Sequence, residues 1–584
     1  MKKILLSTLG FLGSFAAFSQ MYVSPNSYVF VNDQFVYVKQ DVNLQNNGNI
    51  FLRNKSQLLQ GATGVGSNTG AGKLSVFQEG TVNNFQYNYW CSPVGNASAT
   101  IGNEPFGITM LNRPTGLTAS VPATILPTAN LNGTANPLAI APYWIWRFIT
   151  SNAYAQWAFA GSGSTINPGE GFTMKGTSGT DATIVDPADG VQNNSGSAQR
   201  YDFRGKPNDG SMSTAVSLGN FTLVGNPYPS AIDLNAYLLD PANAAVINGQ
   251  AYFWEQVVVN SHNLNQYQGG YGVYNPGTGI YTPAAFWTYD GSGSQGVPAG
   301  GGTIFQRRFS PIGQGFMVMG TTSGNVTMKN DFRVFVKEAV ANQSQFARTT
   351  DGDVVDSEFF PAIPNVAGTD YTQIRKGTAP YLRINAMYNN GGVRPTTIAF
   401  LDTATDGFDY GADGRSPSGE TAEFYYVLTD MPHEYVATAV QFDIDKRIPV
   451  GFRCTASTNF KLQVKDVVDF DVNQPVYLHD KQTGIYYDIK NGIFDMVMPA
   501  GDNRTRYEIT FKNTDVVLSN PTDVADAFTV FQNNESGMLT IYNTLNKDIT
   551  ALMMYDVTGK LVLNKTNLGK AVSYEFSTSA LSDG

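Results

Sequence analysis

Short runs of alternating hydrophobic and polar residues, separated by turns of Asn and Gly, recur along the chain. Residues 20–80 are typical, because runs that begin at Tyr28, Phe35, Asp41 and Asn49 are rich in β-branched and aromatic residues. Such runs predict short β-strands. Their close spacing fits either a meander or a few rungs of a β-solenoid, and we favour the solenoid.

A repeated pattern occupies the next part of the chain. Residues 171–184 read GFTMKGTSGTDATI and residues 315–328 read GFMVMGTTSGNVTM, and each segment follows a turn that contains Pro and Gly. Glycine at such a turn supplies a positive φ or allows another backbone to approach closely. The two segments are therefore expected to form equivalent strands.

The landmarks upstream of these segments are also repeated. An aromatic block precedes each segment, Tyr143-Trp-Ile-Trp146 in one copy and Tyr252-Phe-Trp254 in the other, and a proline turn precedes each block. The same landmarks in the same order predict two related β modules, at residues 81–190 and 215–335. The second module carries a long insertion after Trp254.

The following region contains one predicted helix and then returns to strands. The helix is expected near Leu234, with Ser230 as its N-cap and Asp233 in its first turn. Residues 338–378 are polar with scattered prolines, which predicts a linker. Residues 379–515 consist of strand-like runs and turns with almost no helix, which predicts a β-sandwich of jelly-roll or immunoglobulin-like type.

Composition agrees with a β-rich protein. Of the 584 residues, 12% are aromatic and only 14% are charged, and 59 are glycine. Disordered segments instead combine low hydrophobicity with high charge. A chain of this length also exceeds what one hydrophobic core supports. We therefore predict an all-β, multidomain fold.

The first residues have the features of a secretory signal peptide. Two lysines near the start precede an apolar stretch, and the small residues Ala17 and Ser19 stand before Gln20. The alternative is an N-terminal membrane anchor, but the apolar stretch is shorter than the roughly 20 residues that span a bilayer. Residues 1–19 are therefore predicted to be a signal peptide, so the chain is expected to be exported.

Charge and motif content narrow the function. The formal net charge is −10, whereas nucleic-acid binding depends on a basic surface, so no nucleic-acid partner is expected. Cys91 and Cys454 lie far apart in the sequence and are interpreted as two buried free thiols. Because no nucleophile, phosphate-binding or zinc motif is present, we expect neither catalytic residues nor a resident cofactor. Paired carboxylates can lie far apart in sequence, so that possibility stays open.

Residues 526–584 predict a small antiparallel β domain. Hydrophobic and polar residues alternate in three strand-like runs. The turn Asp556-Val-Thr-Gly559 places Gly where a hairpin needs positive φ. The segment also resembles the type A C-terminal sorting domain of type IX secretion cargo in Bacteroidota. The residues that carry this resemblance are Tyr555, Asp556, Gly559, Lys560, Leu581 and Gly584.

The resemblance implies an export route. The signal peptide would take the chain into the periplasm, where the outer-membrane type IX translocon and its shuttle protein would recognise the folded sorting domain. In the family this domain is usually removed, and the cargo is attached to surface lipopolysaccharide or released. The alternative is an ordinary terminal immunoglobulin-like domain. Because the family's pattern continues past this turn, the natural chain is also expected to extend beyond Gly584; a true terminus with a degenerate domain is the alternative.

An acidic loop at residues 402–420 is a candidate calcium site. Carboxylate oxygens suit Ca²⁺, but the loop lacks one ligand and the flanking helices of an EF-hand. The alternatives are a structural calcium site of another type and a solvated turn, and we favour the turn. The candidate ligands are Asp402, Asp406, Asp409, Asp413 and Glu420.

The insertion of the second module is rich in aromatic residues and amides. Aromatic faces pack against the C–H groups of a pyranose, and amides pair with its hydroxyls. Sugar binding is one interpretation; aromatic packing within an irregular loop is the other, and we favour the second. The candidate glycan contacts are Trp254, Tyr267, Tyr271 and Trp287.

These patterns favour a non-enzymatic protein that is secreted or displayed on the cell surface, such as an adhesin or surface component. The alternative is a secreted carbohydrate-binding protein or a glycan-active enzyme. A convergent pair of acids in a cleft would favour an enzyme, whereas an aromatic platform would favour glycan binding.

Overall fold

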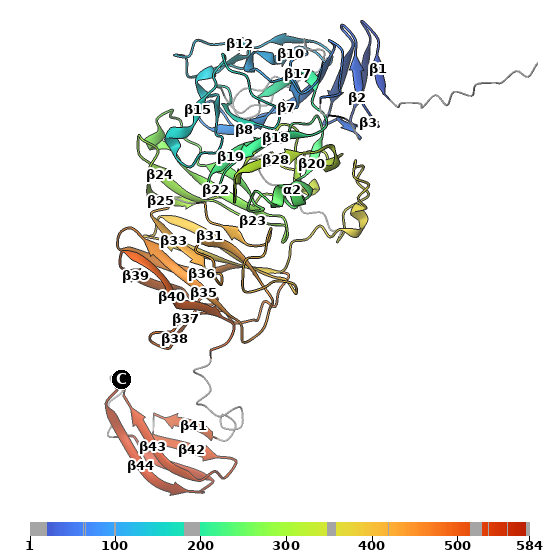
Figure 1. Cartoon of the computed structure of the whole chain (residues 1–584). Coiled ribbons are helices and arrows are strands. Elements are labelled where there is room, and N and C mark those ends of the chain that lie inside the picture. Colours follow the sequence, from blue (N-terminus) through green and yellow to red (C-terminus); the bar gives the residue numbers. More distant parts are fainter. Residues whose placement is uncertain are drawn as a thin grey trace, which may run out of the picture. The chain divides into compact units, whose positions relative to one another are not determined.

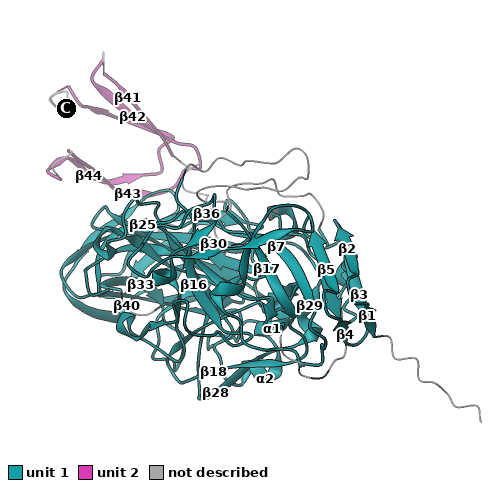
Figure 2. Cartoon of the chain, turned by 90° about the horizontal axis from the view of Figure 1, so that it is seen from above, with its two compact units in different colours: residues 1–512 teal, residues 513–584 magenta. Residues whose placement is uncertain are grey.

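The computed structural model describes residues 20–61, 64, 66–97, 101–179, 199–346, 358–417, 420–513, 528–534, 536–556 and 559–579. Their regular secondary structure is almost entirely β-strand, with only a few short helices, which confirms the all-β, multidomain prediction (Figure 1). The chain forms two compact units, residues 1–512 and 513–584 (Figure 2). Among the described residues, no helix has the length and apolar character needed to cross a membrane. The predicted signal peptide, residues 1–19, lies outside the described residues.

Each of the first three strands pairs in parallel with the strand three places later in the chain. The pairs are β1 (Met21–Val23) with β4 (Val42–Leu44), β2 (Tyr28–Asn32) with β5 (Asn49–Arg53), and β3 (Phe35–Val38) with β6 (Gln57–Gln60). At the corners, Asn26 and Asn47 both adopt φ near 58°, and Asn47 Nδ2 donates to Asn26 Oδ1 at 3.0 Å. Because a meander pairs neighbouring strands antiparallel, this register confirms the solenoid interpretation.

The repeated segments form the same strand pair in both modules. The pairs are β8 (Tyr87–Cys91) with β16 (Gly171–Lys175), and β19 (Phe221–Gly225) with β27 (Gly315–Met319). Phe172 lies opposite Trp90 in the first pair, and Phe316 lies opposite Val224 in the second. The repeat in the sequence is therefore a repeat of strand register.

The two modules contact each other through backbone groups at these strands. Cys91 N donates to Gly313 O at 2.8 Å, and Gly225 N donates to Gly169 O at 3.2 Å. A Cβ atom on Gly225 would lie 2.5 Å from the Cys91 Cβ. Glycine at this position therefore permits the close backbone approach.

The remaining strands complete both modules. In the first they are β7 (Lys73–Glu79), β9 (Val94–Gly95), β10 (Leu111–Pro114), β11 (Ser120–Pro122), β12 (Thr124–Ile125), β13 (Ala139–Ile140), β14 (Trp146–Arg147), β15 (Ala158–Phe159) and β17 (Arg200–Pro207). In the second they are β18 (Met212–Val216), β20 (Ala231–Asp233), β26 (Phe309–Ser310), β28 (Gly324–Met328) and β29 (Arg333–Val334).

The insertion of the second module is a sheet, not an irregular loop. It begins within β21 (Ala251–Gln256) and contains β22 (Gln268–Asn275), β23 (Ile280–Thr282), β24 (Ala285–Tyr289) and β25 (Gln295–Gly301). These strands join β27 and β19 in one seven-stranded sheet, with β22 paired to β21 and β24. The aromatic residues of the insertion therefore stand on a regular, hydrogen-bonded support.

Two short α-helices follow β20, namely α1 (Leu234–Leu238) and α2 (Pro241–Ala244). The N-cap of α1 is Asp233, whose carboxylate accepts hydrogen bonds from Asn235 N and Ala236 N. The expectation of Ser230 as N-cap is therefore wrong. The residues after Ser230 are extended in β20 and pair with β26 and β29, so the helix begins later.

Part of the stretch predicted as a linker packs against the second module. Phe360 and Tyr371 are buried in a cluster with Phe309 and Val334. Tyr371 also donates from its hydroxyl to Asp233 Oδ2 at 2.8 Å. Residues 358–376 therefore belong to the folded unit.

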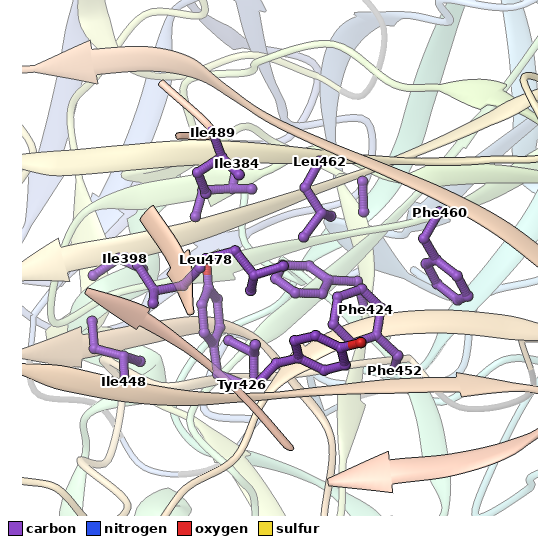
Figure 3. Packing of buried hydrophobic residues seen from close by; sticks show 14 of the residues in the cluster. Ile384, Ile398, Phe424, Tyr426, Ile448, Phe452, Phe460, Leu462, Leu478 and Ile489 are labelled. Atoms are coloured by element: carbon purple, nitrogen blue, oxygen red, sulfur yellow. The ribbon is translucent and has the colours of Figure 1, made fainter. Parts of the chain in front are cut away.

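The next region is one continuous eleven-stranded sheet. Its strands are β30 (Tyr381–Tyr388), β31 (Gly392–Phe400), β32 (Gly414–Arg415), β33 (Ala422–Tyr426), β34 (Tyr435–Val440), β35 (Arg447–Cys454), β36 (Thr458–Val468), β37 (Tyr477–Asp480), β38 (Ile485–Asp488), β39 (Phe494–Met498) and β40 (Gly501–Thr510). Leu478 and Phe460 come from strands near opposite ends of the sheet, yet both lie in one core with Ile384 and Phe424 (Figure 3). The sheet therefore curls around a single core.

The C-terminal unit contains two small sheets. One joins β41 (Phe528–Asn533), β42 (Met538–Asn543) and β45 (Ser573–Ser577), and the other is the hairpin of β43 (Ile549–Tyr555) and β44 (Leu561–Gly569). Gly559, in the turn of this hairpin, has φ +83°. The predicted hairpin and its glycine are confirmed.

Candidate ligand-binding cavity

A cavity of about 680 Å³ lies on one face of the two repeated strand pairs. Both modules and the segment before β33 contribute to its lining, and half of the 24 lining residues are aromatic. The aromatic lining residues are Tyr87, Tyr89, Trp146, Phe148, Tyr154, Trp157, Phe221, Trp254, Tyr267, Tyr271, Trp287 and Tyr289.

The alternation of the strands explains why aromatic residues reach this face. Tyr87 and Tyr89 alternate along β8 and share one side of it, and Thr173 of β16 lies opposite Tyr89. Trp90, between the cavity-facing residues, packs into the core of the first module on the other side. One face of β8 therefore lines the cavity, and its other face packs in the core.

Contacts between rings fix the central wall of the cavity. Tyr89 and Tyr271 share a hydrogen bond between their hydroxyl oxygens at 2.7 Å, which joins the two modules. Trp254 packs edge-on against Tyr271, with ring centroids 5.2 Å apart. Burial raises the pKa of both tyrosines well above the ordinary value, so their hydroxyls stay protonated.

Tyr267 is held by a buried lysine. Lys175 Nζ donates to the Tyr267 hydroxyl, lies 3.2 Å from His262 Nδ1, and stands 3.5 Å from the centre of the Trp144 ring. Burial lowers the pKa of Lys175 to about 6. At neutral pH this amine is therefore largely uncharged, and it positions Tyr267 rather than presenting a charge to the cavity.

The four residues predicted as glycan contacts all line this one cavity. Trp254, Tyr267, Tyr271 and Trp287 come from three strands and one short turn of the insertion, and the fold brings them together. Other aromatics of the insertion serve the core instead. Tyr274 and Tyr281 are buried in the core cluster of the second module.

Several lining residues were not singled out as binding candidates from the sequence. Tyr87, Tyr89, Trp146 and Trp157 belong to the first module, where the aromatic block at residues 143–146 suggested only the filling of sheet faces. The repeat in the sequence could have identified them, because equivalent strands of two related modules can lie side by side and present their side chains to the same face.

Glu420 is the acidic residue among those that line the cavity in the described part of the chain. Its Oε1 accepts from Arg394 Nη2 at 2.9 Å, while the same guanidinium donates to both oxygens of Glu423 at 2.8 Å. All three side chains are buried. One cation is thus shared by two acids.

The carboxylates of the predicted calcium loop do not converge. Asp402 and Asp406 are exposed, and Asp406 pairs with Lys446. Asp409 accepts from Thr405 N at 2.7 Å, and Asp413 Oδ1 accepts from Ala439 N at 2.9 Å.

Glu420, the fifth candidate ligand, forms an ion pair with Arg394. Within the described residues, no group of three or more His, Cys, Asp or Glu side chains is placed to hold a metal ion. Internal hydrogen bonds or ion pairs already engage Asp406, Asp409 and Asp413, so we interpret the loop as a turn.

The predicted sorting residues lie in the C-terminal unit. Tyr555 ends β43 and is exposed, and the Asp556 Oδ1 accepts from Lys560 N at 3.0 Å. Gly559 N donates to Asp556 O at 2.9 Å, which closes the turn. Leu581 and Gly584 lie outside the described residues.

One family model matches the chain. It is the model of a domain of unknown function, DUF8693, and it covers residues 121–511. All cavity-lining residues except Tyr87 and Tyr89 lie within this match. No curated protein and no solved structure matches the chain.

Proposed function

The chain belongs to the DUF8693 family, and we propose that it is an exported protein that binds a carbohydrate in the aromatic cavity. The observation that carries this proposal is the convergence of twelve aromatic side chains from two modules around about 680 Å³ of space. This volume lies within the range of roughly 300–1,000 Å³ typical of small-molecule sites.

The chemistry of the lining supports a sugar. Aromatic faces offer an apolar surface to the C–H groups of a pyranose ring, and their hydroxyl and indole groups offer hydrogen bonds at the edges. Tyr154, about half exposed at 49%, is a lining residue that solvent also reaches. A sugar at the end of a longer glycan could enter where Tyr154 meets solvent.

We propose binding rather than hydrolysis. Glycoside hydrolysis ordinarily uses two carboxyl groups that flank the scissile bond. Glu420 is the single acid among the described lining residues, and its neighbour Glu423 is occupied by Arg394, Tyr388 and Ser416. An adhesive or glycan-capturing role therefore fits this cavity better than a catalytic one.

The proposed location is the cell surface or the medium. The signal-peptide pattern at residues 1–19 and the resemblance of residues 526–584 to a type IX sorting domain support it independently. In this proposal the translocon and its shuttle protein are transient partners, and surface lipopolysaccharide or another glycan is the lasting one.

A glycan array probed with the full-length protein tests the proposal. We expect selective binding to a subset of saccharides, followed by loss of about tenfold or more in affinity for Trp254→Ala and Tyr154→Ala. Tyr22→Ala is the matched control, because Tyr22 is exposed on β1 and is not part of the cavity lining.

Two results would contradict carbohydrate binding. One is a folded protein that binds no saccharide on the array. The other is binding that Tyr22→Ala weakens as much as the two cavity variants do, since that pattern places the ligand elsewhere.

A further inference from the structure

The loop between β21 and β22, residues 257–267, docks on the first module. Gln86 Nε2 of that module donates to Val259 O at 2.8 Å. At the end of the loop, the Tyr267 hydroxyl donates to Phe85 O at 2.9 Å. Tyr267 lines the cavity, so the docking of this loop fixes part of the cavity wall.

His262 is the loop residue that inserts its ring between side chains of the first module. The ring stacks on Trp144, with centroids 4.9 Å apart, and packs against Phe85 at 4.8 Å. Its Nε2 lies 2.6 Å from Asn132 Oδ1, and its Nδ1 lies 3.2 Å from Lys175 Nζ. All four neighbours belong to the first module, so this ring anchors the loop.

The neighbours of His262 fit a neutral imidazole. Asn132 Oδ1 can only accept a hydrogen bond, so Nε2 carries the ring proton. Nδ1 is then an acceptor, and the Lys175 amine donates to it whether the amine is neutral or charged, since both forms keep an N–H. The docked arrangement therefore does not depend on which form Lys175 takes.

The pair of Lys175 and His262 can hold one positive charge but not two. A protonated imidazole donates from both nitrogens, so its Nδ1–H would point at the amine, and two cations would stand 3.2 Å apart. An imidazolium gains from stacking on Trp144, but repulsion between two full charges at this distance exceeds a cation–π contact. Burial, followed by the charge of Lys175, lowers the pKa of His262 to about 4.

The surroundings of the pair do not compensate a second charge. The titratable groups around it and its aromatic neighbours are the tyrosines Tyr87, Tyr143, Tyr154 and Tyr267. Burial raises the pKa of Tyr87 and of Tyr267, so both stay uncharged. Within the described residues, no carboxylate is among the contacts of Lys175 or His262.

We propose that Lys175 and His262 form an acid-sensitive latch between the two modules. At neutral pH the latch docks residues 257–267 on the first module and holds Tyr267 in the cavity wall. When both groups are cations, their repulsion releases the loop and withdraws Tyr267. The effect on a ligand rests on the proposed carbohydrate binding, whereas the docking of the loop does not.

The direction of the pH effect follows from proton linkage. Docking lowers the pKa of both groups, so the released loop binds more protons than the docked loop. The contribution of His262 is complete above its ordinary value of 6.5 and is lost as the pH falls toward about 4. Lys175 acts in the same direction between pH 10.5 and about 6. Acid therefore favours release.

Hydrogen exchange of the full-length protein, measured by mass spectrometry without any saccharide, tests the latch. Exchange of residues 257–267 should rise about tenfold or more from pH 7.5 to pH 4.5, after correction for the intrinsic effect of pH. The flanking strands β21 and β22 serve as the internal reference, because the latch does not act on their ladder.

Three variants separate the latch from a general effect of acid. His262→Gln stays neutral, and its amide can accept from Lys175 and donate to Asn132, so it should lose the acid response. Lys175→Met removes the second cation while keeping an unbranched apolar side chain, so it should weaken the response. His433→Gln is the matched control, because it removes a histidine that lies before β34 and is not part of the latch.

A second measurement reports the protonation of His262 itself. The chain has only three histidines, so the ring signals of ¹³C-labelled histidine can be followed by NMR as the pH changes. The signal that disappears in His262→Gln belongs to His262. We expect it to titrate well below 6.5.

The outcomes distinguish the latch from the function of the cavity. An equal acid response in wild type, His262→Gln and Lys175→Met would overturn the latch, and so would a measured His262 pKa of 6.5 or above. For a saccharide identified on the array, affinity should fall from pH 7.5 to pH 4.5 in wild type but not in His262→Gln. Release of the loop in a protein that binds no saccharide would leave the latch standing and overturn the proposed function. Release with an unchanged affinity would overturn the link between latch and cavity.

Discussion

Gly225 lies where the two modules approach each other closely. A Cβ atom there would be 2.5 Å from the Cys91 Cβ and 2.7 Å from Gln314 O. Gly225→Ala is therefore expected to destabilise the protein by about 1–3 kcal/mol, seen as a lower midpoint of the first thermal unfolding transition. Gly163→Ala is the control, because its added Cβ would meet nothing within 4 Å. Equal midpoints for the two variants would show that the module contact tolerates the extra carbon.

At the same scale, the sequence shows which residues have the chemistry to bind a ligand better than it shows which side chains contact each other. Trp254, Tyr267, Tyr271 and Trp287 could be chosen because aromatic residues gather in one segment of the chain, and all four line the cavity. Glu420 was grouped with the acids of its own loop. Its partner Arg394 lies on another strand, 26 positions away, and no local pattern shows which distant cation meets a given acid.

Among the elements, the parallel ladder at the N-terminus depends on corners that turn with positive φ. Asn47 has φ 58° and donates to Asn26 across one rung. Asn47→Ala should raise the hydrogen-exchange rate of residues 21–60, measured by mass spectrometry, because Ala pays about 1–2 kcal/mol for this conformation. Asn47→Gly removes the same side chain without that strain and should exchange nearly as slowly as wild type. Faster exchange in both variants would assign the effect to the Asn–Asn hydrogen bond.

Strands and helices could be predicted where a local sequence pattern determines them. The prediction failed where pairing between distant strands determines the conformation. The repeat gave β16 and β27, and the alternation in the C-terminal unit gave the hairpin of β43 and β44. The N-cap of α1 was misplaced because Ser230 is as good a cap as Asp233 by residue type. Pairing of β20 with β26 and β29 keeps the residues after Ser230 extended, and that information lies far away in the sequence.

At the scale of the molecule, the cavity is formed by the two repeated modules together with the insertion in the second module and the segment before β33. Each module alone contributes one face of two strands, and the insertion in the second module supplies the wall that holds Tyr271 and Trp287. The segment before β33 then adds Glu420. No single segment contains the site, which explains why the sequence identified the aromatic residues of the insertion but neither Glu420 nor the aromatic residues of the first module as part of it.

Export, by contrast, is proposed to reside in one segment that carries none of the cavity. Residues 513–584 form a compact unit, and the cavity lining ends at Glu420. Deleting residues 526–584 from the native gene should therefore leave the protein in the periplasm, because the sorting signal is lost while the signal peptide remains. Gly559→Val should lower export as well, since φ +83° strains a β-branched residue in the turn, whereas Lys565→Ala, an exposed change on the same hairpin, should not. Cell fractionation with protease treatment of intact cells measures the outcome, and a deleted protein that still reaches the surface in normal amount would disprove the route.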